Sequence, residues 1–195
     1  MKKIRILLLA GVLLLALASP SLADTLFSYA ATDLPKPLPD MQTTYDTINV
    51  TAHGTITDLN VFLNLDHNYV GDFTISIAHG ATSVWLMSHD GDSGDNVRNV
   101  SFDDSANTSI SDGIPPYDLG PFKPTTHKTH NNLLSAFNGQ DVYGAWTLNY
   151  QDLALGDSGT LDNFGVEGTL VPLPPAILLL GSGLLGLIGI RRFSS

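Results

Sequence analysis

The sequence contains no cysteine, so an exported form of this chain has no disulfide framework. Its stability must therefore come from a hydrophobic core. Glutamate is almost as scarce, because Glu167 stands alone against eighteen aspartates. Aspartate favours turns and caps, where its short side chain bonds the nearby backbone. This composition indicates many loops between strands and few helices.

Basic residues are also scarce between the two ends of the chain. All nineteen acidic residues lie within 24–170, against four basic ones, which gives this segment a formal charge near −15. Such a surface disfavours nucleic acid and anionic lipid as partners. Divalent cations are plausible partners instead.

The first 23 residues have the layout of a secretory signal peptide. A basic start at Lys2, Lys3 and Arg5 precedes an apolar run over 6–18. Small residues before the expected cut predict cleavage after Ala23 by signal peptidase. The alternative is an uncleaved membrane anchor, for which the apolar run is short. We therefore expect the chain to be exported.

The other end of the chain carries a second apolar segment. Residues 172–190 are uncharged, and Arg191 and Arg192 follow them. The length suffices for a transmembrane helix, and the arginines place its end in the cytoplasm. The alternative is a buried helix of a soluble domain, which its glycines would weaken.

The parts of residues 171–195 together resemble the PEP-CTERM sorting signal. Pro172 and Pro174 form a Pro-x-Pro pair before the apolar helix, and the arginine cluster ends it. Leu173 stands where the family usually has glutamate. The resemblance implies processing by exosortase, a membrane transpeptidase of Gram-negative bacteria that make extracellular polysaccharide. A transient anchor in the inner membrane would be followed by release to the cell surface or extracellular matrix.

Alternating apolar residues predict short strands separated by glycine- and aspartate-rich turns, typical of an all-β sandwich. The proline-rich stretch 35–39 predicts a stiff, extended conformation, so residues 24–44 are expected as a lead-in to a domain over 45–170. The strands are expected at 56–65, 72–79, 83–88, 145–152 and 164–169.

Gly-Asp-Ser-Gly, the core of the nucleophile motif of chymotrypsin-like proteases, occurs twice, with its serine at Ser93 and again at Ser158. A unique nucleophile should not occur twice, and neither copy continues with the motif's further glycine. No histidine stands in a recognisable protease context to serve as base. Both serines are better interpreted as turn residues.

Four sequence blocks, in order, resemble the P domain, also called P/Homo B. They read HNYVGDF, GDN…FDDSA, LSAFNGQD…GAWTL and D…GDSGTL, and lie at 67–73, 94–106, 134–148 and 152–161. This β-sandwich follows the subtilisin-like catalytic domain in furin- and kexin-type convertases and many bacterial proteases. The resemblance implies a jelly-roll, galactose-binding-like fold. Val70 replaces the usual arginine, and Phe164 the usual tryptophan.

Aspartates in or beside the matched turns are the candidate calcium ligands. Calcium takes about six to eight oxygen ligands, largely carboxylates and carbonyls from loops. The resemblance also supports calcium, since bacterial P domains are reported to hold it; the alternative is that these residues cap turns and face water. The neighbours Asp103 and Asp104 are the strongest candidates. The full set is Asp72, Asp95, Asp103, Asp104, Asp141 and Asp152.

Two other patterns are better explained by structure than by chemistry. His127 and His130 could bind zinc on a helix, but their surroundings predict a loop and offer no third ligand. Trp85 and Trp146 alternate with apolar neighbours, which favours a core role over sugar stacking.

The sequence therefore predicts an exported module that binds a protein or a glycan and does not catalyse. The strands begin about twenty residues after the expected cleavage site, which leaves no room for the catalytic motifs of a subtilase. Any endopeptidase label would be inherited from P-domain relatives. Exopolysaccharide is one expected partner. The alternative is an accessory P domain that docks on and stabilises a separate subtilisin-like protease.

Overall fold

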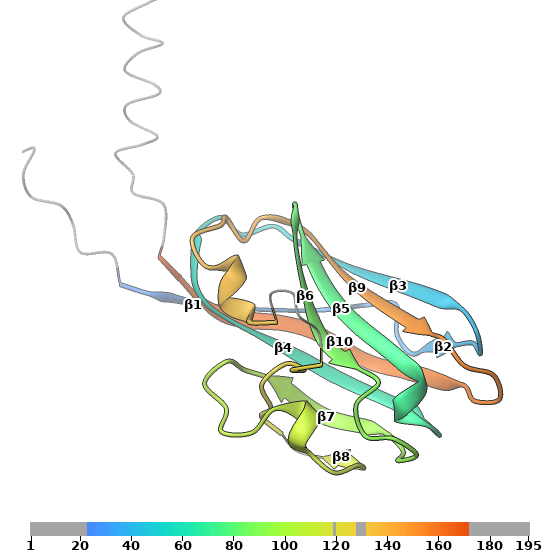
Figure 1. The fold of residues 1–195 in the computed structure, drawn as a ribbon. Helices are drawn as coiled ribbons and strands as arrows, with labels where there is room; N and C mark the ends of the chain where they lie inside the picture. The colour runs from blue at the N-terminus through green and yellow to red at the C-terminus, as the bar shows by residue number, and fades with distance from the viewer. Residues whose placement is uncertain (1–22, 119, 128–131, 172–195) are drawn as a thin grey trace, which may run out of the picture.

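A computed structural model of the chain describes residues 23–118, 120–127 and 132–171. These residues form two β-sheets that pack face to face, which confirms the predicted all-β sandwich (Figure 1). Three short 3₁₀ helices lie in the connections: η1 (Val70–Asp72), η2 (Ile110–Asp112) and η3 (Leu134–Phe137). No helix in these three ranges has the length and apolarity needed to cross a membrane.

The larger sheet is built around two long antiparallel strands, β4 and β10. Its order is β1-β10-β4-β7-β8, and β2 also pairs with β10. Among the strand pairs described for this sheet, only β7–β8 is parallel. The strands are β1 (Thr25–Ala30), β2 (Lys36–Leu38), β4 (Thr55–His67), β7 (Val97–Phe102), β8 (Tyr117–Asp118) and β10 (Gly159–Val171).

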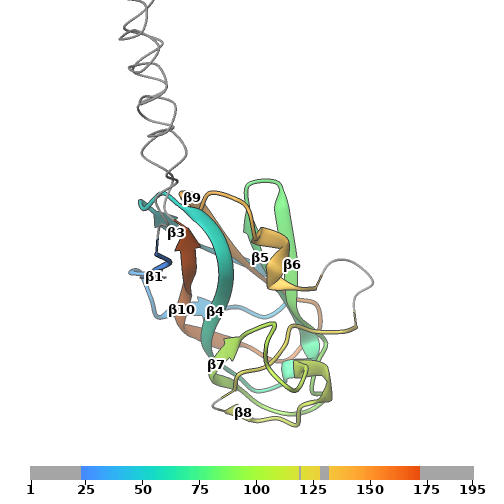
Figure 2. The same cartoon turned by 90° about the vertical axis from the view of Figure 1, so that its left-hand side faces the viewer.

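The smaller sheet has the order β3-β9-β5-β6 and is entirely antiparallel. Figure 2 shows β5 and β6 on the opposite side of the molecule from β1 and β10. The strands of this smaller sheet are β3 (Thr43–Val50), β5 (Phe73–His79), β6 (Thr82–Ser88) and β9 (Gly144–Asp152).

The core lies between the sheets and follows the period of two in the sequence. In β4, Leu59, Val61, Leu63 and Leu65 are buried, whereas the residues between them face outward. Trp146 is fully buried in the core, stacked on the ring of His79. The five predicted strands are thus all present in the structure.

The stretch 24–44 differs from its expectation as a lead-in. It contributes β1, β2 and the start of β3, so the sandwich begins well before residue 45. Lys36 in β2 pairs with Asp46, whose carboxylate in β3 is almost fully buried. The cause is tertiary, because β1 and β2 complete the edge of the sheet beside β10.

The two described ends of the chain lie together at one edge of the larger sheet, where Thr25 pairs with Leu170. Ala23, the expected cleavage position, is exposed. The remainder of the expected signal peptide and the transmembrane helix 172–190 lie outside the described residues. The same holds for the processing residues Pro172, Pro174, Arg191 and Arg192.

Candidate functional site

The first Gly-Asp-Ser-Gly copy forms a turn between β6 and β7 that rests on the β4–β5 connection. The N–H of Gly71 donates to the carbonyl of Asp92 at 2.9 Å, and the N–H of Val70 donates to Gly94 at 2.7 Å. A Cβ on Gly71 would lie 2.5 Å from the Asp92 carbonyl oxygen, so this approach requires glycine. Ser93 lies exposed in the turn, as predicted.

The second copy joins β9 to β10. The N–H of Ser158 donates to the side-chain oxygen of Asn68 at 3.1 Å, and the Asn68 amide donates to Asp157 at 2.6 Å. Gly159 packs against the backbone, since a Cβ there would lie 2.2 Å from the carbonyl oxygen of Asp66. Ser158 is exposed and, like Ser93, lies in a segment that connects two strands.

The histidines that the structure describes contact carboxylates and main-chain carbonyls through their ring nitrogens. None of these nitrogens is hydrogen-bonded to a serine, threonine or tyrosine hydroxyl in the described ranges. His79, for example, contacts two carbonyls, at 2.9 and 3.0 Å. His130 lies outside the described residues, so the His127–His130 spacing stays untested. The ring contacts are His53 to Asp141, His67 to Tyr69, His89 to Gly71, and His127 to Ser88 and Asp90.

Three buried polar atoms without hydrogen-bond partners lie at the end of β9. They are the Nε2 atom of His67, the hydroxyl of Tyr150 and one carboxylate oxygen of Asp152. The His67 nitrogen lies 3.6 Å from the Asp152 oxygen, and both side chains are fully buried. Burial raises the pKa of Tyr150 well above its usual range, and the charges of Asp152 and Asp72 raise it further.

Two of the predicted calcium ligands, Asp72 and Asp152, belong to this region. Burial raises the pKa of Asp72, and the nearby charges of Asp157 and Asp152 act in the same direction. Asp72 and Asp157 are also close enough to hydrogen-bond when one of them is protonated. Like charges this close repel one another at neutral pH unless a cation or proton compensates them.

The strongest predicted pair, Asp103 and Asp104, lies in the loop after β7 and caps the backbone. Both oxygens of Asp104 accept hydrogen bonds from η3, from the N–H groups of Leu134 at 2.9 Å and Ser135 at 2.8 Å. Asp103 accepts the N–H two residues further on, at 2.6 Å. The contacts seen here are those of the turn-capping alternative.

The remaining two candidates lie apart from these pairs. Asp141 accepts hydrogen bonds from the N–H groups of Gly54 and Tyr143 and contacts the His53 ring at 2.8 Å. Burial alone would raise the pKa of Asp141, but these hydrogen bonds outweigh burial and lower it. Asp95 is exposed and lines an open, polar hollow.

No group of three or more histidine, aspartate or glutamate side chains is arranged to hold a metal ion in the part of the chain that the structure describes. The six predicted ligands therefore do not converge on one centre. Of the places they occupy, only the Asp72–Asp152 region combines mutual repulsion with unpartnered buried polar atoms.

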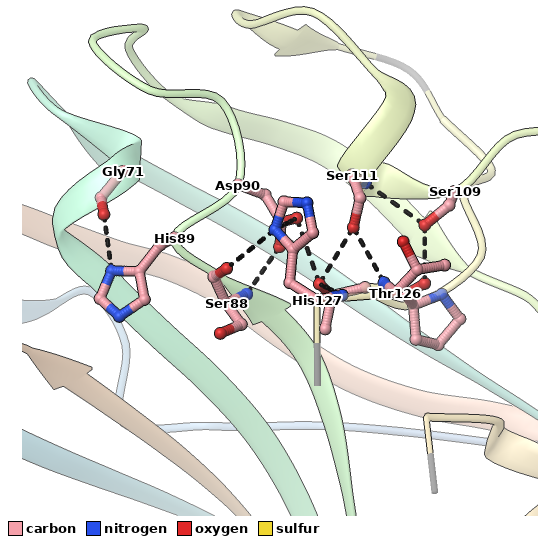
Figure 3. A network of polar contacts seen from close by, with 10 residues as sticks. Gly71, Ser88, His89, Asp90, Ser109, Ser111, Thr126 and His127 are labelled. Atoms are coloured by element: carbon pink, nitrogen blue, oxygen red, sulfur yellow. Dashed lines mark hydrogen bonds and ion pairs between the residues drawn. The ribbon is translucent and has the colours of Figure 1, made fainter. Parts of the chain in front are cut away.

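A polar network that no sequence pattern predicted surrounds Asp90, as Figure 3 shows. Asp90 is fully buried and accepts hydrogen bonds from the N–H of Ser88 at 2.6 Å and the hydroxyl of Thr125 at 3.1 Å. The Nδ1 atom of His127 lies 3.1 Å from the same carboxylate. Thr125 also contacts the hydroxyl of Ser111 at 3.0 Å.

This network connects the segment made of residues 109–118 and 120–127 to the end of β6. Tyr117, in that segment, has a buried hydroxyl without a partner, and burial together with Asp90 and Asp92 raises its pKa to about 12. No signal in the sequence separates Asp90 from the other aspartates of its loop. Its partner Thr125 is 35 residues away, so only the tertiary fold selects it.

The fold and these clusters define a class: a two-sheet β-sandwich with acidic, turn-rich connections.

No protein-family model matches the chain, and no curated protein matches it. Among solved structures, it is similar to a serine protease of Aeromonas sobria, with a TM-score of 0.51 and 16% identity. That match covers 82% of this chain and 29% of the protease chain. The structure of the A. sobria protease in complex with its chaperone ORF2 matches at 15% identity and a TM-score of 0.47, over 83% of this chain and 29% of that one. At these identities the likeness shows the fold alone.

Proposed function

We propose that this chain is an exported, non-catalytic β-sandwich module that binds a partner at the cell surface or in the extracellular matrix. One observation carries the proposal: in the described ranges, no hydroxyl nucleophile is hydrogen-bonded to a histidine base. Nucleophilic catalysis by serine needs that contact, and also a group that orients the base.

Export, anchoring and sorting complete the proposal. The N-terminal segment would be removed after Ala23, and the C-terminal segment would hold the chain in the membrane until exosortase cuts near Pro172 and Pro174. Since Thr25 pairs with Leu170, the mature N-terminus and the anchor would leave the sandwich at the same sheet edge. The jelly-roll, galactose-binding-like topology and a stabilising calcium ion belong to the same proposal.

Two measurements test this function. The purified full chain should not hydrolyse casein or a mixture of peptide substrates, and Ser93→Ala and Ser158→Ala should leave that result unchanged. Hydrolysis that one of these substitutions abolishes would refute the non-catalytic role. Mass spectrometry of the protein recovered from the cell surface should show a form that begins at Asp24 and lacks Arg191 and Arg192. A surface form that retains both arginines would refute processing by exosortase.

A second candidate function is favoured by the likeness to the A. sobria serine protease. The match spans 29% of that chain, so this sandwich corresponds in fold to a part of a larger enzyme. A P-domain-like accessory module of this kind would dock on a separate subtilisin-like protease and stabilise it. Its test is the melting temperature of a subtilase that lacks such a sandwich, measured with and without this chain. An unchanged melting temperature at saturating concentration would exclude the accessory role for that enzyme.

A further inference from the structure

The outward face of the larger sheet carries a groove along β1, β10 and β4. Two adjoining hollows, of about 460 and 170 Å³, form it and share Ser28 and Glu167 in their walls. We call this feature the outer-sheet groove. The groove is also lined by Asn60, Phe62, Asn163 and Gly165.

The strand register explains why this face is hollow. Gly165 pairs with Ala30 on one side and with Phe62 on the other, so the outward row contains a position without a side chain. The next outward row is Ser28, Glu167 and Asn60, in which a short hydroxyl faces two longer polar groups. Small residues on β1 and β10 thus form the floor, and the larger side chains form the walls.

The walls offer hydrogen-bonding groups that the protein itself leaves unused. Within the described residues, no hydrogen bond or ion pair involves the side chain of Glu167 or Asn163, and the side-chain oxygen of Asn60 is buried without a partner. The ring of Phe62 makes no contact with another aromatic ring there and is half-buried. A buried polar atom without a partner is costly, so a ligand hydroxyl that donates to it would be stabilised.

From this groove we infer that the module binds a neutral, hydroxyl-rich glycan chain laid along β10. The inference deepens the proposed binding function and rests on it. From Asn163 to Thr169 the strand runs about 20 Å, at roughly 3.3 Å per residue, which is room for a short run of sugar rings. The carboxylate and amide groups suit ligand hydroxyls, and an aromatic face suits the apolar face of a sugar ring.

Charge selects neutral over anionic glycans. Neither hollow has a lysine or an arginine in its wall, whereas Glu167 and Asp58 each contribute a carboxylate. Burial raises the pKa of Asp58, and the charges of Asp103 and Asp104 raise it further, so this end of the groove already holds excess negative charge. An anionic polysaccharide would bring more negative charge to it without a compensating cation.

The test is affinity gel electrophoresis of the full chain, purified in detergent. The gels contain dextran, galactomannan or mixed-linkage β-glucan as neutral probes, alginate as a polyanion and chitosan as a polycation. We expect retardation by at least one neutral probe and none by alginate. Phe62→Ala and Glu167→Ala should each weaken the retardation about tenfold, a loss of about 1.4 kcal/mol.

The matched control is Tyr45→Ala, which removes an aromatic ring that is 60% exposed on β3 of the other sheet. It should leave the retardation unchanged, and melting curves should show all three variants folded. No retardation by any neutral probe would overturn the inference, as would retardation by chitosan alone or equal binding by Phe62→Ala and the wild type. Binding of an extended peptide in the groove, shown by competition, would also overturn it. None of these results affects the test for peptide hydrolysis, so failure here leaves the non-catalytic role standing.

Discussion

Replacing Asp90 by alanine tests how strongly the buried network holds the sandwich together. Ser88 is almost fully buried, and its N–H would lose its acceptor, at a cost of about 1 to 3 kcal/mol. The Thr125 hydroxyl would also lose a partner but keeps its contact with Ser111. We therefore expect a total loss of about 2 to 4 kcal/mol, a large part of the roughly 5 to 15 kcal/mol that stabilises a typical domain.

The measurement is urea denaturation of the full chain, followed by tryptophan fluorescence. Asp90→Asn keeps one acceptor oxygen and the side-chain volume, so its loss should be smaller, about 1 to 2 kcal/mol. Asp112→Ala is the matched control, because this aspartate is exposed and lies in the segment that the network fastens. A free energy of unfolding for Asp90→Ala within about 0.5 kcal/mol of the wild type would show that the Asp90 network does not stabilise the sandwich, since that is the range of surface substitutions.

Two further predictions concern charges. Lys36→Met leaves the Asp46 carboxylate, which is only 1% exposed, without its cation and should destabilise the fold. We expect a loss of about 2 to 4 kcal/mol, below the full cost for a fully buried pair, because Lys36 itself still reaches solvent. Lys123→Met is the control, and an equal effect of both substitutions in thermal melts would contradict the ion-pair explanation. For Asp72, burial and then the charges of Asp157 and Asp152 raise the pKa in the folded state, so the folded chain binds this proton more tightly than the unfolded chain. Its contribution to stability is therefore complete below the ordinary pKa of 3.8 and is lost as the pH rises through the raised value. Melting temperatures from pH 4 to 7 should fall less in Asp72→Asn than in the wild type, and calcium at pH 7 should raise the wild-type melting temperature more than that of the variant. Parallel pH profiles, or a midpoint that neither calcium nor a chelator shifts, would count against this cluster as a cation site.

The strands with a clean period of two could be predicted because their pattern is local. In β4 and β9, one residue in two is buried, and the sequence shows this directly. Strands β3 and β7 do not show this pattern so clearly. In β3, the charged Asp46 points inward and interrupts the apolar pattern, and its burial depends on Lys36 in another strand. In β7, an irregularity in the pairing with β4 shifts the register.

For the sites, the sequence identified acidic turns but not the role of each aspartate. Asp72 and Asp104 look alike as turn residues, yet one belongs to a repelling cluster and the other caps η3. The groove also had no sequence signal, because Gly165 and Phe62 meet only through the pairing of β10 with β4.

The all-β class, the acidic character, the principal strands and the turn role of both Gly-Asp-Ser-Gly copies follow from the amino-acid sequence alone. These properties depend on composition and on the alternation of neighbouring residues, which every chain segment carries with it. The burial of Asp90, the pairing of residues 24–44 into a sheet and the groove over Gly165 arise only when the chain folds. Each of these depends on contacts between residues far apart in the chain, which local patterns do not encode.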